Sequence, residues 1–263
     1  MSQPPTPSKS PVRSAIVTGA SSGIGAATAE AFGALGWRVS LGARRLDRLE
    51  EVAKRVESAG GEPFFHSLDV SDPGSIDVFY QASCDALGPV EVLVNNAGMN
   101  MLNHLVDARP ADLQYEIAVN LTGAILMARR VVPAMLERRE GDVVWVSSEN
   151  AVRPRPFQIG YTAAKAGLEG AARVLGMETE GTGVRSMIVR VGPTGTEFGN
   201  ALDEGKLHEA LESWRYWGVQ RHLRWMPASS VANVIAKLVT TPVEESYPTV
   251  IEVMPGGHSK EHR

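Results

Sequence analysis

A glycine-rich turn between an apolar run and an alanine-rich segment constrains the fold of this chain most. The run Ala15-Ile16-Val17 predicts a buried strand, and the segment from Ala26 to Leu35 predicts a helix. Between them lies the sequence TGASSGIG. Glycines let the backbone turn tightly and approach a ligand, and the N-terminus of a helix attracts anions. The stretch therefore predicts a strand, turn and helix that bind a pyrophosphate. A tight turn without a ligand is the alternative.

The next predicted strand ends in two arginines. Residues 38–43 read as this strand, and the strand-helix-strand order implies a parallel pair with a right-handed crossover. In dinucleotide-binding folds, a carboxylate at the end of this strand holds the free ribose 2′-hydroxyl. This chain has Arg44 and Arg45 there, and no acid before Asp47. Two guanidiniums suit a 2′-phosphate, so the sequence favours NADP(H) over NAD(H). Solvated arginines at the start of the helix 46–59 are the alternative.

Strands continue to alternate with helices along the rest of the chain. Further strands are expected at 64–68, 90–94, 142–148, 185–191 and 249–253. Asp69 follows one of them, where it either contacts an adenine amino group or forms a turn. Asn95-Asn96-Ala97-Gly98 follows the next strand and either lines a cofactor or forms a plain loop. The pattern predicts an α/β domain with a doubly wound parallel sheet of six to seven strands and helices on both faces.

Length and composition fit one domain. The formal net charge of −4 gives no basic footprint for nucleic acid or a membrane surface. The single Cys84 fits a reducing compartment, and no apolar run approaches the ~18 residues of a membrane span. His208 and His222 lack the spacing of metal ligands. We expect a cytoplasmic protein with a domain over 13–255, a disordered proline-rich tail over 1–12 and a C-terminal tail over 256–263.

Several polar side chains are placed where chemistry is expected. Tyr161 and Lys165 are four residues apart in a predicted helix, so they share a face, and the ammonium would lower the pKa of the phenol. Surface packing is the commoner meaning of such a pair. Ser147 and Ser148 end a strand at the carboxyl edge of the sheet. Asn120 lies within the apolar pattern of a helix predicted over 112–138, where it is either a structural bridge or part of a polar relay.

Residues 192–227 interrupt the alternation and hold three of the five tryptophans. We expect Leu207, Leu211 and Trp214 to share one face of a helix that closes the core, covers a substrate, or does both. Aromatic side chains favour an apolar or ring-containing substrate. The arginines of the segment favour an acidic one: Arg215, Arg221 and Arg224.

Together the motifs resemble the short-chain dehydrogenase/reductase family, in its single-domain branch. The resemblance covers residues 14–253 and rests on the order and spacing of five motifs and one serine. These are TGASSGIG at 18–25, LDV at 68–70, NNAG at 95–98, VNLTG at 119–123, Ser148, and YTAAK at 161–165. The resemblance implies a Rossmann-like fold. It also implies an enzyme that interconverts a small secondary alcohol and a ketone by hydride transfer with NADP(H).

The resemblance also implies a role for each catalytic residue. Tyr161 would be the general acid in carbonyl reduction and the base in alcohol oxidation. Lys165 would lower the pKa of that tyrosine and hold the nicotinamide ribose. Ser148 would hydrogen-bond the reacting oxygen, and Asn120 would anchor a water chain that resupplies the proton.

Cofactor contacts are implied along the same edge of the sheet. Arg44 would bind the 2′-phosphate with support from Arg45, Asp69 would contact adenine, and Thr196 would contact the nicotinamide carboxamide. The full implied set is Gly19, Ser21, Ser22, Gly23, Ile24, Gly25, Arg44, Arg45, Asp69, Val70, Asn96, Ala97, Gly98, Tyr161, Lys165, Gly192, Thr194 and Thr196.

Two departures from the family pattern affect these contacts. Val191 precedes Gly192 where the family usually has proline, and Ser22 stands where many NADP-using relatives carry a basic residue. Family analogy further implies a homotetramer or homodimer. The alternatives are an NAD-dependent dehydrogenase and a catalytically inactive dinucleotide-binding regulator. A lyase or dehalogenase on this scaffold would usually have lost the cofactor turn.

Overall fold

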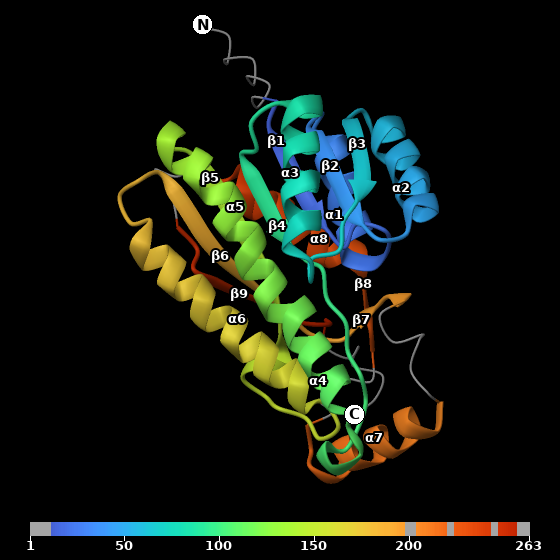
Figure 1. The fold of residues 1–263 in the computed structure, drawn as a ribbon. Helices are drawn as coiled ribbons and strands as arrows, with labels where there is room; N and C mark the ends of the chain where they lie inside the picture. Colours follow the sequence, from blue (N-terminus) through green and yellow to red (C-terminus); the bar gives the residue numbers. More distant parts are fainter. Residues whose placement is uncertain (1–11, 198–203, 220–223, 243–246, 257–263) are drawn as a thin grey trace, which may run out of the picture.

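Seven strands form one parallel sheet in the order β3-β2-β1-β4-β5-β6-β9 (Figure 1). The structure is a computed structural model that describes residues 12–197, 204–219, 224–242 and 247–256. The strands are β1 (Ser14–Thr18), β2 (Arg38–Ala43), β3 (Glu62–Ser67), β4 (Val92–Asn95), β5 (Gly141–Ser148), β6 (Val184–Val191) and β9 (Val250–Val253). The predicted doubly wound sheet is confirmed.

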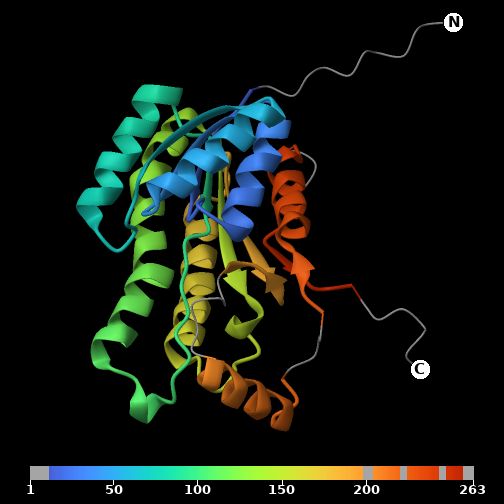
Figure 2. The same cartoon turned by 90° about the vertical axis from the view of Figure 1, so that its right-hand side faces the viewer.

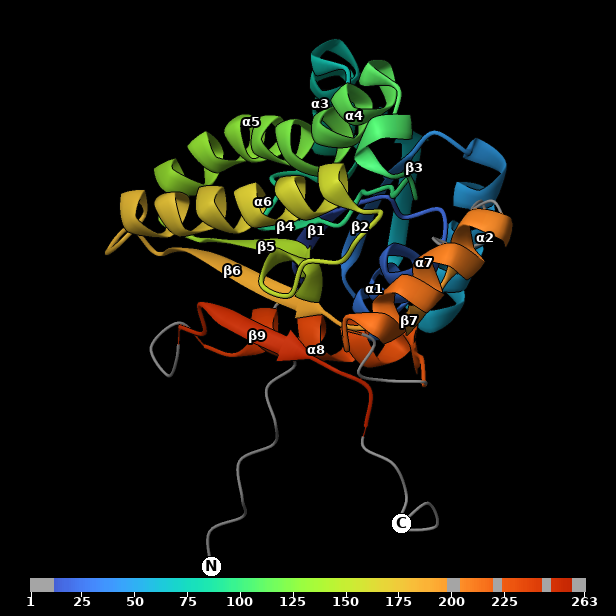
Figure 3. The ribbon, with the colours of Figure 1, turned by 90° about the horizontal axis from the view of Figure 1, so that it is seen from below.

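Helices cover both faces of this sheet (Figure 3). One face carries α1 (Gly23–Ala34), α2 (Leu46–Ala59) and α8 (Ala228–Thr240). The other carries α3 (Pro73–Leu87), α4 (Pro110–Ile117), α5 (Gly123–Arg138) and α6 (Ile159–Glu178). α3 has a capped start, because the side chain of Asp72 accepts a hydrogen bond from the Gly74 N–H, and Pro73 is the first helical residue.

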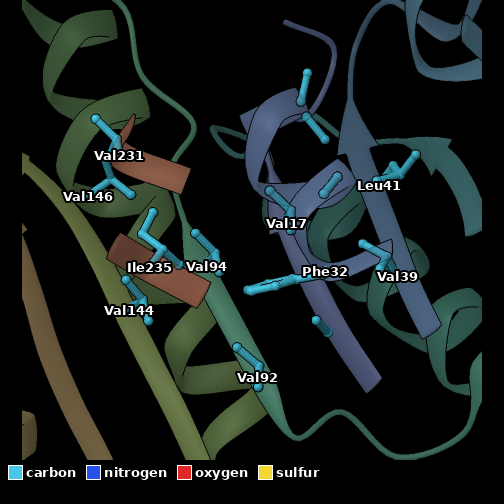
Figure 4. Packing of buried hydrophobic residues seen from close by; sticks show 14 of the residues in the cluster. Val17, Phe32, Val39, Leu41, Val92, Val94, Val144, Val146, Val231 and Ile235 are labelled. Atoms are coloured by element: carbon cyan, nitrogen blue, oxygen red, sulfur yellow. The ribbon is translucent and has the colours of Figure 1, made fainter. Parts of the chain in front are cut away.

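Alternating side chains of the central strands build two cores. Val17 and Val144 face α1 and α8, whereas Ile16 and Trp145 face α5 and α6. Figure 4 shows the first core, where Phe32 lies among the valines of the central strands. Burying one such side chain contributes about 1.5–3 kcal/mol, so strands buried on both faces account for the continuous apolar runs of the sequence.

The order of the sheet reverses between β1 and β4. β1 continues outward through β2 and β3, while β4 continues in the opposite direction through β5 and β6. The loops that leave the carboxyl ends of β1 and β4 therefore diverge, which opens a crevice where doubly wound folds bind their ligands. A short helix, α7 (Glu204–Tyr216), lies beyond this same edge (Figure 2).

Some local features differ from the sequence-based expectations. The helix predicted over 112–138 is divided into α4 and α5 by a π-helical turn, η2 (Ala118–Thr122). α8 has Pro227 as its N-cap and makes no side-chain cap hydrogen bond, although Ser229 and Ser230 lie in its first turn. A small parallel pair, β7 (Thr194–Gly195) with β8 (Met226–Pro227), was not predicted.

The helical stretch Pro110–Arg138 is long and apolar enough to cross a membrane by length and hydropathy. In the fold it forms α4, η2 and α5, and side chains such as Met127, Val131 and Met135 pack against the sheet. The helix of a buried core passes the same test of length and hydropathy. The predicted tails lie largely outside the described residues, as do 198–203 and 220–223 of the predicted cover.

Candidate active site

The glycine turn brings α1 against the ends of β1 and β4. Gly19 has φ of +65°, and a Cβ on it would lie 2.8 Å from the Ala97 Cα atom. A Cβ on Gly25 would lie 2.4 Å from the Gly19 carbonyl oxygen. Both positions therefore exclude any side chain. The side chain of the N-cap residue Ser22 makes no capping hydrogen bond to the helix, so the first turn of α1 presents backbone N–H groups to the crevice.

The ends of β1 and β4 are joined by side chains. The Thr18 hydroxyl accepts hydrogen bonds from the N–H groups of Asn96 and Ala97, both at 3.0 Å. The Asn96 amide donates to the Thr18 carbonyl oxygen at 2.9 Å. An amide side chain thus ties the neighbouring strands β1 and β4 together. This joint holds the chain around Gly98 in place, where a Cβ would lie 2.9 Å from Asn120 Oδ1.

The serine, tyrosine and lysine expected to be catalytic meet at the carboxyl end of β5. Ser148 is the last residue of that strand, and its side chain is hydrogen-bonded to Tyr161 in the first turn of α6. Lys165 Nζ lies 5.7 Å from the centre of the Tyr161 ring and donates to the Val146 carbonyl oxygen at 2.9 Å. Ser147 points elsewhere, because its hydroxyl donates to Glu169.

Burial sets the protonation of this group. Burial raises the pKa of Tyr161 to about 12; Ser148 and Arg155 act against the rise, and Glu116 and Glu149 add to it. Burial also lowers the pKa of Lys165 to about 8. The predicted lowering of the tyrosine pKa is therefore wrong for this structure, since loss of solvent outweighs the neighbouring charges. Tyr161 holds its proton at neutral pH, as a general acid must.

Asn120 occupies the π-helical turn and bridges two backbone segments. Its side-chain nitrogen donates to the carbonyl oxygens of Met99 at 2.8 Å and Glu116 at 2.9 Å. Its side-chain oxygen accepts from the Met99 N–H at 3.1 Å. These contacts confirm the structural-bridge interpretation. The water chain implied by the family resemblance stays a prediction.

The adenosine side of the crevice begins at Asp69. Its Oδ1 accepts from the N–H and hydroxyl of Ser71 at 2.9 and 2.6 Å, which is the turn-forming role that sequence analysis weighed. Burial raises the pKa of Asp69. The Ser71 hydrogen bonds and the Arg44 charge together lower it by more, so the net shift is downward. Val70 lies beside it, and a Cβ on Gly123 of α5 would be 2.4 Å from its carbonyl oxygen.

The two arginines after β2 point to different places. Arg44 Nη1 donates to the Tyr115 hydroxyl of α4 at 2.5 Å. Arg45 Nη2 donates to the hydroxyls of Ser21 and Ser22 at 3.1 and 3.0 Å. Sequence analysis gave Arg44 the main role toward a 2′-phosphate and Arg45 a supporting one. The structure brings Arg45, and not Arg44, onto the serines of the glycine turn.

The segment after β6 reaches back over the glycine turn. Gly192 donates its N–H to the Val253 carbonyl oxygen at 2.9 Å, and the Thr194 hydroxyl donates to the Gly192 carbonyl oxygen at 2.9 Å. Thr196 follows β7, and a Cβ on Gly23 would lie 3.1 Å from its side chain. The three residues are thereby placed at the same edge as the turn.

Sequence reasoning missed a charged group around Tyr161. Glu149 is 2% exposed and forms a close ion pair with Arg155, whose guanidinium lies 5.2 Å from the centre of the Trp214 ring. Glu116, also 2% exposed, accepts from the Met101 N–H at 2.7 Å. The acid directly after Ser148 was the available signal.

α7 is attached to the site through a small apolar cluster. Its members Leu207 and Trp214 confirm the predicted apolar face of the helix, and Ala210 lies between them, fully buried. Leu211 does not belong to the cluster. Trp214 Nε1 donates to the Pro156 carbonyl oxygen at 2.9 Å, which places an aromatic side chain close to the charged group beside Tyr161.

Comparisons with known proteins agree with this geometry. The short chain dehydrogenase family model matches residues 13–207. A short chain dehydrogenase of Pseudocercospora fijiensis is 35% identical over 236 residues, covering 88% of this chain and 76% of that protein. An alcohol dehydrogenase of the archaeon Thermococcus sibiricus, solved with 5-hydroxy-NADP, has a TM-score of 0.79 at 25% identity, covering 92% of this chain and 96% of that one.

A metagenomic short-chain oxidoreductase solved with NADP has a TM-score of 0.77 at 31% identity. The match covers 94% of this chain and 98% of the chain of that oxidoreductase. The family model spans well over half of the sequence, including the glycine turn and the serine, tyrosine and lysine group. The chain therefore belongs to the short chain dehydrogenase family of oxidoreductases.

Proposed function

We propose that this protein is an NADP(H)-dependent oxidoreductase that interconverts a secondary alcohol and a ketone. The observation that carries the proposal is the hydrogen bond between Ser148 and Tyr161, with Lys165 one helical turn away at the carboxyl edge of the sheet. A buried phenol that holds its proton and lies beside a hydroxyl is suited to protonate a developing alkoxide.

The residues around the crevice fit a dinucleotide. Gly19 and Gly25 leave no room for side chains, and α1 begins at the turn, so its N-terminus would attract a pyrophosphate. Asp69 follows β3, and its Oδ1 accepts two hydrogen bonds from Ser71, which fix the orientation of the carboxylate. When bound, the nicotinamide supplies or accepts the hydride.

The chain's own residues then handle the proton. In reduction, Tyr161 donates its phenolic proton to the carbonyl oxygen, and Ser148 stabilises the charge that develops on that oxygen. Lys165, fixed by the Val146 carbonyl oxygen, supplies a positive charge next to the tyrosine that is left deprotonated. In oxidation the same groups act in reverse, with Tyr161 as the base.

Two arginines support the choice of NADP(H). Arg44 and Arg45 follow β2, where a carboxylate would otherwise hold a free 2′-hydroxyl. Two structural relatives were solved with NADP or a derivative of it. We further propose, by family analogy, a cytoplasmic homotetramer or homodimer.

The function is tested by incubating the purified protein with NADPH and a panel of ketones while following nicotinamide absorbance. We expect consumption of NADPH with at least one ketone, and formation of NADPH from the matching alcohol and NADP. Tight binding of NADPH without turnover of any carbonyl compound would favour the inactive regulator instead. Turnover with NADH at equal efficiency would favour an NAD-dependent dehydrogenase.

The cofactor assignment predicts the effect of replacing Arg44 by alanine. A charge-assisted hydrogen bond contributes about 1.5–3 kcal/mol, so we expect the Kd of NADPH to rise by at least about tenfold and that of NADH to stay within about twofold. Titration calorimetry measures both. Lys54→Ala, which removes an exposed cation paired with Glu50 on α2, is the control. If Arg44→Ala keeps the wild-type ratio of the two Kd values, Arg44 does not bind the 2′-phosphate, and the role would fall to Arg45.

The lowered pKa of Lys165 predicts the pH dependence of carbonyl reduction. Lys165 is charged below its pKa of about 8 and neutral above it, while Tyr161 keeps its proton until about 12. We expect kcat/KM to be constant below about pH 7 and to fall about tenfold per unit well above pH 8. Circular dichroism at each pH excludes unfolding as the cause. A rate that is unchanged up to about pH 10 contradicts the assignment.

A further inference from the structure

An acidic side chain pairs with Arg45, one of the two arginines proposed to bind the 2′-phosphate of NADP(H). Arg45 Nη1 donates to Glu197 Oε2 at 3.1 Å, while its Nη2 holds the hydroxyls of Ser21 and Ser22. The guanidinium thus joins the glycine turn to Glu197, the residue after Thr196. The ion pair is about half exposed on both sides, at 47% and 46% of the side-chain surface.

The backbone that carries Glu197 is held in this position by the fold. β7 pairs with β8, and the N–H of Met226 donates to the Pro193 carbonyl oxygen at 3.0 Å. Thr196 then lies over Gly23, which brings the next residue to the rim of the turn. Glu197 also lines a cavity of about 310 Å³ beside the turn, together with Ser21 and Ser22. The Glu197 carboxylate therefore lies at this rim.

A 2′-phosphate and the Glu197 carboxylate compete for the same donors. A phosphate monoester carries about −1.5 to −2 charges at neutral pH and is bound best when an arginine offers both terminal nitrogens. In this structure one of the two is paired with Glu197. A dinucleotide without the 2′-phosphate leaves that ion pair intact. The carboxylate thus penalises one cofactor and not the other.

On the basis of the proposed cofactor, we propose that Glu197 is a specificity-determining residue. It reduces the preference of the protein for NADP(H) over NAD(H). It does so by neutralising Arg45 and repelling the 2′-phosphate. An isosteric amide at this position keeps the size of the side chain and a hydrogen-bond acceptor but removes the charge. The substitution therefore removes the negative charge that opposes the phosphate at Arg45.

The test compares the Kd values of NADPH and NADH, measured by titration calorimetry, in the wild-type protein, Glu197→Gln and Glu51→Gln. Glu51 pairs with Arg48 at 3.2 Å on the wall of the same cavity and has similar exposure, so it is the matched control. We expect Glu197→Gln to bind NADPH about threefold to fivefold tighter, with the Kd of NADH unchanged, and Glu51→Gln to change neither.

An unchanged or weakened NADPH affinity in Glu197→Gln overturns the inference, as does an equal gain for NADH or an equal effect of Glu51→Gln. Failure of the proposed cofactor gives a different result, because the wild-type protein then binds NADPH no tighter than NADH. A wild-type preference for NADPH that Glu197→Gln leaves unaltered removes the inference and keeps the proposed function.

Discussion

Replacing Tyr161 by phenylalanine is expected to lower kcat/KM for carbonyl reduction by about 10³-fold. Positioned general acids contribute about 10²–10⁴ to a rate, and Ser148 and Lys165 remain in this variant to orient the substrate and stabilise charge. Tyr161 is 9% exposed, so the substitution removes one hydroxyl from a buried position and leaves the ring in place.

 The retained phenyl ring keeps the packing of the first turn of α6. The rate is measured with NADPH and whichever ketone the wild-type protein reduces.

Two controls separate lost chemistry from lost structure. Tyr161→Phe is expected to bind NADPH within about threefold of the wild-type Kd, because general-acid catalysis acts on the transition state and not on cofactor binding. Tyr247→Phe removes a different hydroxyl, which accepts a hydrogen bond from the Ser186 N–H at 3.0 Å. That variant should keep the wild-type rate. Full hydride transfer by Tyr161→Phe would show that another group delivers the proton.

Most of the fold could be predicted because its signals are local. The apolar runs of β1 and β5 are continuous, which is typical of parallel strands buried on both faces. The glycine turn, the Asp72-Pro73 start of α3 and the four-residue spacing of Tyr161 and Lys165 are also contained in short stretches of sequence. Short-range geometry therefore determined which residues reach the carboxyl edge of the sheet.

The remaining features depend on contacts between distant residues. The π-helical turn places Asn120 against the backbone of Met99, and the apolar periodicity of the helix sequence does not predict that contact. The partner of Arg45 lies 152 positions further along the chain. The raised pKa of Tyr161 follows from its burial, which a one-turn spacing to Lys165 does not reveal. Side-chain direction and solvent exposure are properties of the assembled fold.

A second large effect is expected at the opposite edge of the sheet, where Asp142 joins two arginines. Its Oδ2 accepts from Arg13 Nη1 at 2.8 Å, and its Oδ1 accepts from Arg185 Nε at 2.6 Å. The carboxylate side chain is 2% exposed, and those of Arg13 and Arg185 are 12% and 3% exposed. The same arginines donate to the carbonyl oxygens of Val239 and Thr241, so the group ties β1, β5 and β6 to the end of α8.

Asp142→Asn is expected to lower the free energy of unfolding by about 3–5 kcal/mol, because it leaves two buried guanidiniums without their shared counter-charge. Urea unfolding followed by circular dichroism measures the change. Asp77→Asn makes the same substitution in an exposed pair with Arg130, at 3.0 Å, and should cost less than about 1 kcal/mol. Equal small losses in the two variants would mean that water reaches the Asp142 group and screens it as it does the surface pair.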